Sequence, residues 1–264
     1  MVYDTRILSF KGLEAASILT LAGRLTVPMR MGEYQQVQFH RARGQADLVL
    51  VDNVFYLLVA VETPEESPLE PQGFIGVDLG IVNIATDSTG ETFSGEAVEH
   101  TRQRYHRLRQ TLQAKGTRSA RRHLQKTRRK EAHFRRNHNH VIAKHLVEKA
   151  KDTTRGIALE DLKHIRSRTT VRKFDRAKHS GWAFFQLQAF IDYKAHLNGI
   201  PVVYVDPWYT SRTCAVCGHA DKTNRKTQSH FQCVSCGHVA NADTNAAINI
   251  AGRAEVMRPI VCVP

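Results

Sequence analysis

The stretch GFIGVDLGIVNIATDSTGETFSG, residues 73–95, decides the fold. Its first apolar run ends on an acid, Asp78, and a second apolar run ends at the turn-forming residues Asp87-Ser88-Thr89-Gly90. A third short apolar segment follows the turn. We therefore predict three strands joined as an antiparallel meander, with Asp78 at the end of the first strand.

The residues that follow predict helices and further strands. Residues 98–114 are expected to form one helix and residues 119–149 a second, with Gly116 between them. The segment RGIALEDL predicts a buried strand that ends on Glu160, and IPVVYVD predicts another after the amphipathic segment WAFFQLQAFIDYKAHLNG. Together these segments predict an α/β fold, a mixed sheet covered by helices. The apolar positions expected to face inward in the second helix are Leu124, Phe134, Val141, Ile142, Leu146 and Val147.

The N-terminal part has a different pattern. Residues 1–62 are expected to form a small β-rich domain of short strands, including one at EYQQVQFHR and a hairpin that turns at Asp52-Asn53. Residues 63–72, TPEESPLEPQ, contain three prolines and three glutamates and are expected to be a linker.

Positive charge is concentrated in one region. The chain has 38 Lys and Arg against 25 Asp and Glu, a net charge of +13, yet residues 101–150 alone have 16 Lys and Arg against two acids, a net +14. A basic run can be a solvated helix face. Fifty such residues interleaved with apolar ones instead favour a nucleic-acid partner.

No run of apolar residues is long enough to span a membrane, and MVYDTRILSF does not resemble a signal peptide. A cytoplasmic location is therefore expected. In that compartment cysteines stay reduced, which makes metal binding a better explanation for them than disulfides.

Two Cys-x-x-Cys pairs predict a zinc ribbon. Cys214 and Cys217 are separated from Cys233 and Cys236 by fifteen residues, a spacing typical of four-cysteine Zn²⁺ sites. The alternative is four unrelated buried or redox thiols. A closed site of four cysteines has a structural role. No role is assigned to the fifth cysteine, Cys262.

Three carboxylates are candidates for a second metal site: Asp78, Glu160 and Asp243. Asp78 and Glu160 each end a predicted buried strand, where a carboxylate is costly unless it is paired or bound to metal. Three converging carboxylates could hold two Mg²⁺ or Mn²⁺ ions, which activate water and stabilise the leaving oxygen in phosphodiester hydrolysis. Gly76 and Gly80 are expected to leave room for a phosphate backbone.

Each acid also has a simpler explanation. Asp243 could cap the helix at TNAAINIAG, Asp161 stands beside Glu160, and Asp206 is a fourth candidate acid.

The segment NHNH, residues 137–140, resembles part of an HNH nuclease motif but lies inside a predicted helix. The segment YTSRT, residues 209–213, is expected to support the ribbon by packing, with nucleic-acid contact as the alternative.

These motifs resemble, in order, those of the TnpB family, transposon-encoded RNA-guided nucleases related to type V CRISPR effectors. GVDLGIVNIAT is similar to the family's first RuvC motif, ALEDL to its second and DTNAAINI to its third. The resemblance covers about residues 73–252. It implies an RNase H-like (RuvC) domain, residues 73–209, with a basic helical hairpin at 98–150, a zinc ribbon at 210–240, and a final helix and tail at 241–264.

The resemblance also implies a function. Asp78, Glu160 and Asp243 would be the metal ligands of a DNA endonuclease, and a guide RNA and target DNA would be its partners. A prokaryotic, nucleoid-associated location follows. The residues expected to meet phosphates are Arg121, Arg122, Lys126, Arg128, Arg129, Arg135 and Arg136.

One departure from the family leaves alternatives open. Residues 1–62 are similar only to the last strands of the family's wedge domain, so we expect an N-terminally shortened homologue. A second protein chain that supplies the missing lobe is a further expected partner. The alternative functions are a nuclease-silent or partner-dependent RNA/DNA-binding protein and a guide-free RuvC-type nuclease acting on branched DNA.

Overall fold

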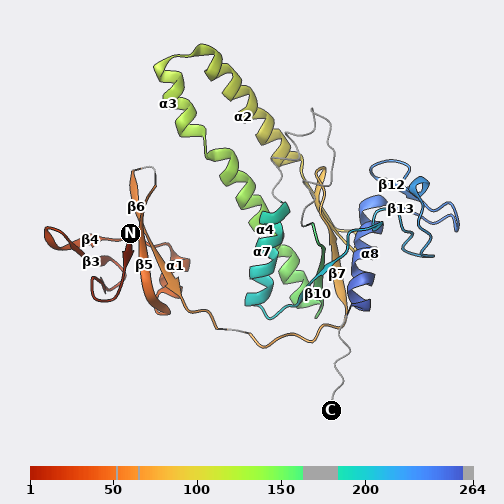
Figure 1. The fold of residues 1–264 in the computed structure, drawn as a ribbon, viewed down its shortest axis with the longest axis horizontal. Coiled ribbons are helices and arrows are strands. Elements are labelled where there is room, and N and C mark those ends of the chain that lie inside the picture. Colours follow the sequence, from red (N-terminus) through yellow and green to blue (C-terminus); the bar gives the residue numbers. More distant parts are fainter. Residues whose placement is uncertain (52, 65, 163–183, 258–264) are drawn as a thin grey trace. The chain divides into compact units, whose positions relative to one another are not determined.

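The fold was analysed in a computed structural model that describes residues 1–51, 53–64, 66–162 and 184–257. The chain divides into two compact units, Met1–Pro64 and Glu65–Pro264, which are described separately (Figure 1). None of the described helices combines the length and the apolar character needed to cross a membrane.

The first unit consists of two three-stranded antiparallel sheets, ordered β2-β3-β4 and β1-β5-β6, which share a small core that includes Tyr3, Leu8 and Ile18. The β5–β6 hairpin has Val51 paired with Val54, as the sequence predicted. Its elements are β1 (Val2–Tyr3), β2 (Leu8–Lys11), β3 (Ala15–Thr20), β4 (Gly23–Pro28), α1 (Glu33–Phe39), β5 (Ala42–Val51) and β6 (Val54–Val61).

The strand predicted at EYQQVQFHR is wrong, because residues Glu33–Phe39 form helix α1. The segment has three glutamines and one glutamate with good helix propensity and lacks the strict alternation of apolar and polar residues that a strand needs.

The second unit is built on one five-stranded mixed sheet, ordered β11-β10-β7-β8-β9. Strands β7, β8 and β9 form the predicted antiparallel meander, and β10 and β11 lie parallel to β7. The strands are β7 (Phe74–Asp78), β8 (Asn83–Asp87), β9 (Thr92–Ser94), β10 (Gly156–Glu160) and β11 (Val202–Val205).

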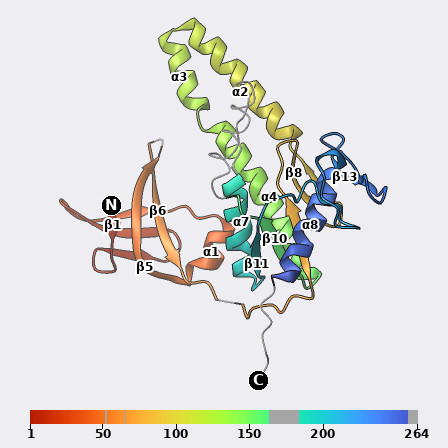
Figure 2. The same ribbon diagram turned by 45° about the vertical axis from the view of Figure 1, so that its right-hand side comes forward.

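Helices cover both faces of this sheet (Figures 1 and 2). Helix α8 (Ala242–Val256) lies on one face against β7, while α4 (Lys130–Asp152) and α7 (Phe184–Leu197) pack together on the other. The larger core cluster includes Ile75, Ile142 and Ile191. Two short strands, β12 (His230–Gln232) and β13 (Val239–Asn241), form a separate hairpin beside α8.

The expectation that Gly76 leaves room for a phosphate backbone is wrong. A Cβ atom on Gly76 would lie 2.0 Å from the carbonyl oxygen of Ala247 in α8. The glycine therefore lets the helix backbone approach β7 closely. At Gly80 a Cβ atom would lie 2.6 Å from the carbonyl oxygen of Asn83, so that space is filled by the turn into β8.

The basic region forms a long helical hairpin in which α2 (Glu96–Lys115) rises and α3 (Arg118–Thr127) and α4 return (Figure 1). The second predicted helix is thus two helices. Ile142, Leu146 and Val147 are buried as predicted. Phe134 and Val141 are 40% and 67% exposed, so their predicted inward orientation is wrong. The segment 137–140 lies within α4, as expected.

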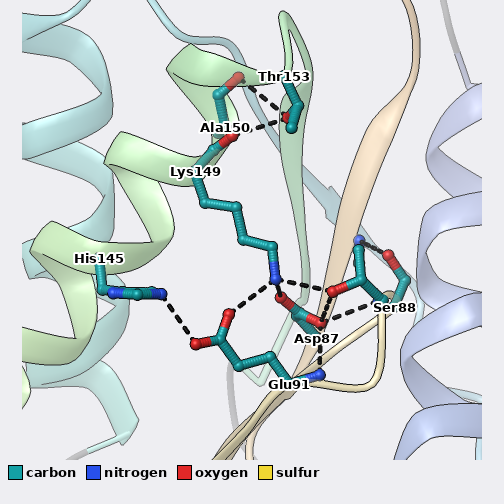
Figure 3. A network of polar contacts seen from close by, with 9 residues as sticks. Asp87, Ser88, Glu91, His145, Lys149, Ala150 and Thr153 are labelled. Carbon is teal, nitrogen blue, oxygen red and sulfur yellow. Dashed lines mark hydrogen bonds and ion pairs between the residues drawn. The ribbon is translucent and has the colours of Figure 1, made fainter.

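A polar network ties α4 to the turn between β8 and β9 (Figure 3). The fully buried Asp87 carboxylate accepts hydrogen bonds from Lys149 Nζ, from Thr89 Oγ1 and from the backbone N–H of Glu91. Lys149 also binds the Glu91 carboxylate at 2.7 Å, and His145 lies 2.9 Å from the same side chain. This network fixes the end of the basic hairpin on the sheet.

Part of the predicted linker is bound to the second unit. The backbone N–H of Leu69 donates to the carbonyl of Gly199, and that of Gln72 donates to the carbonyl of Thr154. Glu66 forms an ion pair with Lys151.

Candidate carboxylate site and four-cysteine cluster

Two of the candidate acids lie at the same edge of the central sheet. Asp78 is the last residue of β7 and Glu160 is the last residue of β10. The strands are parallel neighbours with Val77 paired to Leu159. Asp78 and Glu160 are the next residues of the two strands, so this register brings them to the same end of the sheet. The apolar residues before each acid are fully buried, which brings both carboxylates to the border of the core.

The third acid comes from α8, and it does not cap that helix. The cap is Asn241, whose side-chain oxygen accepts hydrogen bonds from the backbone N–H groups of Asp243 and Thr244. This leaves the Asp243 carboxylate available for other partners. It accepts from Asn83 Nδ2 at 2.9 Å and forms an ion pair with Arg225 at 3.2 Å.

The three acids also interact electrostatically. Burial raises the pKa of Asp78 most, and the negative charges of Glu160 and Asp243 raise it further, to about 7. Arg225 acts in the opposite direction on the same group. Burial also raises the pKa of Glu160 above its usual range, although the Thr210 hydroxyl and Arg253 oppose this shift. Such mutual repulsion identifies a place that would attract a cation.

The carboxylates are also held in position. Thr210 Oγ1 donates a hydrogen bond to Glu160 Oε1, and Gln188 Nε2 donates to the Glu160 carbonyl at 2.9 Å. Both Thr210 and Gln188 are buried. Asp206 is exposed and binds the backbone N–H of Trp208, so its carboxylate stabilises the turn after β11.

The donor set fits hard divalent cations. All three groups supply carboxylate oxygens, which Mg²⁺ and Mn²⁺ prefer to nitrogen and sulfur. The carboxylates are more widely spaced than the thiols described next. Within the described ranges, only the four cysteines form a group of three or more potential ligands whose atoms lie within 4.8 Å of one another.

The four cysteines form a compact cluster from two segments. Cys214 Sγ lies 3.7 Å from Cys236 Sγ, and Cys217 Sγ lies 3.6 Å from Cys233 Sγ. A tetrahedral Zn²⁺ ion with Zn–S bonds of 2.3 Å would have sulfur–sulfur edges of about 3.8 Å. The spacing therefore fits one zinc ion.

The two Cys-x-x-Cys segments have the same backbone geometry. In each, the glycine after the second cysteine donates its N–H to the carbonyl of the first cysteine, and both glycines have φ of 74°. Backbone N–H groups of Cys236 and Ser235 lower the pKa of the Cys233 thiol, which favours a thiolate there, whereas hydrogen bonds among the thiols raise the pKa of Cys217. Cys262 lies outside the described residues.

Buried amide side chains join the cluster to the fold. Asn224 is fully buried, donates to the carbonyls of Arg212 and His219, and accepts from the N–H of Val234. Asn245 and Asn249 of α8 both bind the carbonyl of Thr213, just before the first cysteine. These contacts explain the many asparagines around Asp243 in the sequence.

Sequence reasoning missed Arg225 and Asn83. They are 18 and 160 residues away from Asp243 in the chain. An arginine between two Cys-x-x-Cys pairs looks like any other basic loop residue, and only the folded hairpin brings it to the carboxylates.

The predicted phosphate-binding residues lie on the basic helical hairpin, between strands β9 and β10 in the chain. They fall on α3, on the junction with α4 and on the first turns of α4. Six are exposed and Arg135 is half-buried. The exposed ones are Arg121, Arg122, Lys126, Arg128, Arg129 and Arg136.

Two family patterns match the chain. Residues 56–165 match the family described as "Probable transposase", and residues 184–250 match the family described as "Cas12f1-like, TNB domain". The two matches include the three candidate acids and the four cysteines.

Curated relatives are similar over most of this chain. A CRISPR-associated endodeoxyribonuclease Cas12f1 of Sulfoacidibacillus thermotolerans is 35% identical over 75% of this chain and 50% of its own length. The putative RNA-guided DNA endonuclease InsQ of Escherichia coli (strain K12) is 28% identical over 74% of this chain and 53% of its own length. The chain therefore spans about half the length of these relatives.

The fold also resembles a solved structure. A chain of the "Cryo-EM structure of the Cas12f1-sgRNA-target DNA complex" matches 86% of this chain and 52% of its own, with a TM-score of 0.65 and 16% identity. This shows a mixed α/β fold like that of Cas12 effectors.

Proposed function

The chain belongs to the TnpB family, and from this premise we propose that it acts as an RNA-guided DNA endonuclease of transposon origin. The proposal places phosphodiester hydrolysis at Asp78, Glu160 and Asp243, within an RNase H-like (RuvC) domain. The five-stranded mixed sheet, with two of the acids at one edge, supports that assignment.

One observation carries the proposal. Asp78 and Glu160 end neighbouring parallel strands at the border of the core, and burial together with the charges of Glu160 and Asp243 raises the pKa of Asp78 to about 7. Ordinary folds avoid gathering partly buried carboxylates, because each raises the free energy of ionising the others. A pair of divalent cations would remove this cost, and cation binding is the use that we propose for the cluster.

Bound Mg²⁺ or Mn²⁺ ions would supply water activation and stabilisation of the leaving oxygen in phosphodiester hydrolysis. The side chains of this protein would orient the ions. Asp78, whose ionisation is opposed by burial and by the charges of both other acids, would hold the ions together with Glu160 and Asp243. Thr210 would fix Glu160, and Asn83 would fix Asp243.

Arg225 would balance charge in the same place. Its guanidinium pairs with Asp243 and lowers the pKa of Asp78. When the cations are absent, Arg225 would limit the repulsion between the acids. It is held by the hairpin of the four-cysteine cluster, whose Zn²⁺ would have a purely structural role.

The basic hairpin would bind the nucleic acids. Its exposed Arg and Lys side chains on α3 and α4 suit phosphates, and phosphate contacts carry no sequence information. Base pairing with a guide RNA would therefore select the target DNA. A second protein chain that completes the guide-binding surface is also part of this proposal.

The guided function is tested by sequencing the RNA that co-purifies with the protein expressed together with the DNA flanking its gene. We expect one discrete RNA. A nonspecific mixture, or no RNA, would contradict guiding and favour a guide-free nuclease or a partner-dependent, nuclease-silent binding protein.

A further inference from the structure

Two neighbouring aromatic side chains are exposed in the loop that follows β11. Trp208 is 60% exposed and Tyr209 is 54% exposed, and their ring centroids lie 5.9 Å apart. Large aromatic side chains normally gain stability from burial. The proposed packing role of YTSRT therefore fits Thr210, which is buried, but not Tyr209.

The backbone of this loop is held firmly although its rings are exposed. The N–H of Trp208 donates to Asp206 Oδ1, and the Trp208 carbonyl accepts from Arg253 Nη2 at 2.6 Å. The Tyr209 carbonyl accepts from the N–H groups of Arg212 and Thr213. The two rings thus project from a fixed frame.

The frame is part of the carboxylate site. Thr210, the next residue, donates its hydroxyl hydrogen to Glu160. Arg253, which holds the Trp208 carbonyl, also attracts the Glu160 carboxylate electrostatically. The aromatic pair therefore lies next to one of the three candidate metal ligands.

Tyr209 has a backbone conformation that suits glycine. Its φ is 60°, in the left-handed region, which is unfavourable for a residue that carries a side chain. Strained residues of this kind cluster at functional sites. A ring that is largely exposed contributes little packing to offset the unfavourable backbone conformation. A role in binding would account for its retention in this position.

We propose that Trp208 and Tyr209 stack on the bases of a single nucleic-acid strand as its backbone enters the carboxylate site. This inference rests on the proposed function, because it assigns the pair as positioning residues for that reaction. Aromatic rings bind bases of any sequence through their flat faces, provided that the bases are unpaired. Arg253, which holds the Trp208 carbonyl, and Arg225, which pairs with Asp243, supply positive charge at the carboxylate site for the accompanying phosphates.

The first test measures binding without cleavage. The chain has two tryptophans, so a Trp182→Phe variant reports Trp208 fluorescence alone. In the presence of a chelator, we expect a single-stranded oligothymidylate to quench this fluorescence and an abasic oligonucleotide of equal length and charge not to. Equal quenching by both, or quenching by neither, would overturn the proposal.

The second test separates stacking from folding. Trp208→Leu keeps apolar volume without a π face and should weaken oligothymidylate binding about tenfold, whereas Trp208→Phe should stay within about twofold. Tyr209→Gly should weaken binding similarly while the thermal unfolding temperature stays the same or rises, because glycine relieves the strain. Unchanged affinity, or affinity that falls only in parallel with stability, would contradict stacking.

The outcome is independent of catalysis. If the wild-type protein binds and quenches but never cleaves DNA with Mg²⁺, the nuclease function fails and the stacking site stands. If it cleaves DNA and the Trp208→Leu variant binds and cleaves equally well, the stacking site fails and the nuclease function stands.

Discussion

At the scale of single residues, Asp78 is the most informative group in the molecule. Burial and the negative charges of Glu160 and Asp243 oppose the ionisation of its carboxylate and raise its pKa. Any cation that binds the three acids would hold Asp78 ionised. The residue therefore links metal binding, pH and stability in one measurable group.

Asp78→Asn should stabilise the protein when a chelator is present. The pKa of Asp78 is about 7 in the folded state and 3.8 in the reference state, so ionisation destabilises the fold as pH rises from about 4 to about 7. The variant should be more stable by up to about 3 kcal/mol at pH 8 and equal to wild type near pH 4. Chemical denaturation across this pH range measures the difference; a difference independent of pH would be inconsistent with the raised pKa.

Cys214→Ser should remove the zinc ion that the four thiols are expected to bind. Zinc content should fall from one ion per chain to none, and the unfolding temperature should fall, because ligand binding contributes folding free energy. The matched control is Cys262→Ser, which changes the fifth cysteine and should alter neither quantity. Full zinc content in Cys214→Ser would refute the site.

Residue patterns predicted the acids and the thiols but not their partners. The buried strand ends at Asp78 and Glu160 and the Cys-x-x-Cys spacing are local signals. Arg225 and Asn83 reach Asp243 only through the folded hairpin and the β8 strand. The role of Gly76 could not be predicted either, because α8 and β7, which pack closely at this glycine, are far apart in the sequence.

At the scale of elements, the junction of α4 with the β8–β9 turn decides how the basic hairpin is held. Burial alone would raise the pKa of Asp87, but hydrogen bonds from Lys149, from Thr89 and from the Glu91 backbone bring it below its ordinary value. The carboxylate is fully buried and the Lys149 side chain is 21% exposed. Figure 3 shows these groups converging on one ammonium.

Lys149→Met should destabilise the protein by about 3 kcal/mol at pH 7, because it leaves the Asp87 charge buried without its cation. The lowered pKa of Asp87 means that its contribution is present above about pH 4 and lost in stronger acid, so the cost should shrink there. Lys151→Met, which breaks the exposed pair with Glu66, is the control and should cost less than about 1 kcal/mol. Equal losses in both variants would contradict the network.

Helix periodicity predicted the elements better than their orientations. The basic helices exist, but Phe134 precedes the buried part of α4, which begins at Asn139. Val141 lies on the opposite side of the helix from the face that carries Ile142 and Leu146. In the first unit, the prediction of a strand at α1 is wrong because a seven-residue segment spans only two helical turns, so its lack of strict alternation is a weak signal.

At the scale of the whole molecule, the chain combines a basic helical hairpin, an acidic sheet edge and a four-cysteine cluster in one unit of residues, Glu65–Pro264. The hairpin would bind polyanions while the sheet edge would bind cations. The four-cysteine cluster supplies Arg225 to the acids and leads into α8, which carries Asp243. Loss of the four-cysteine cluster should therefore disturb the acidic sheet edge as well.

The most direct test of this account is Mg²⁺-dependent cleavage of a plasmid that contains the sequence matching the co-purifying RNA. The wild-type protein should cleave it, and Asp78→Ala should cleave at least about a thousandfold more slowly while retaining DNA affinity within about threefold. Cleavage by Asp78→Ala at the wild-type rate, or equal loss of binding and cleavage, would contradict the account.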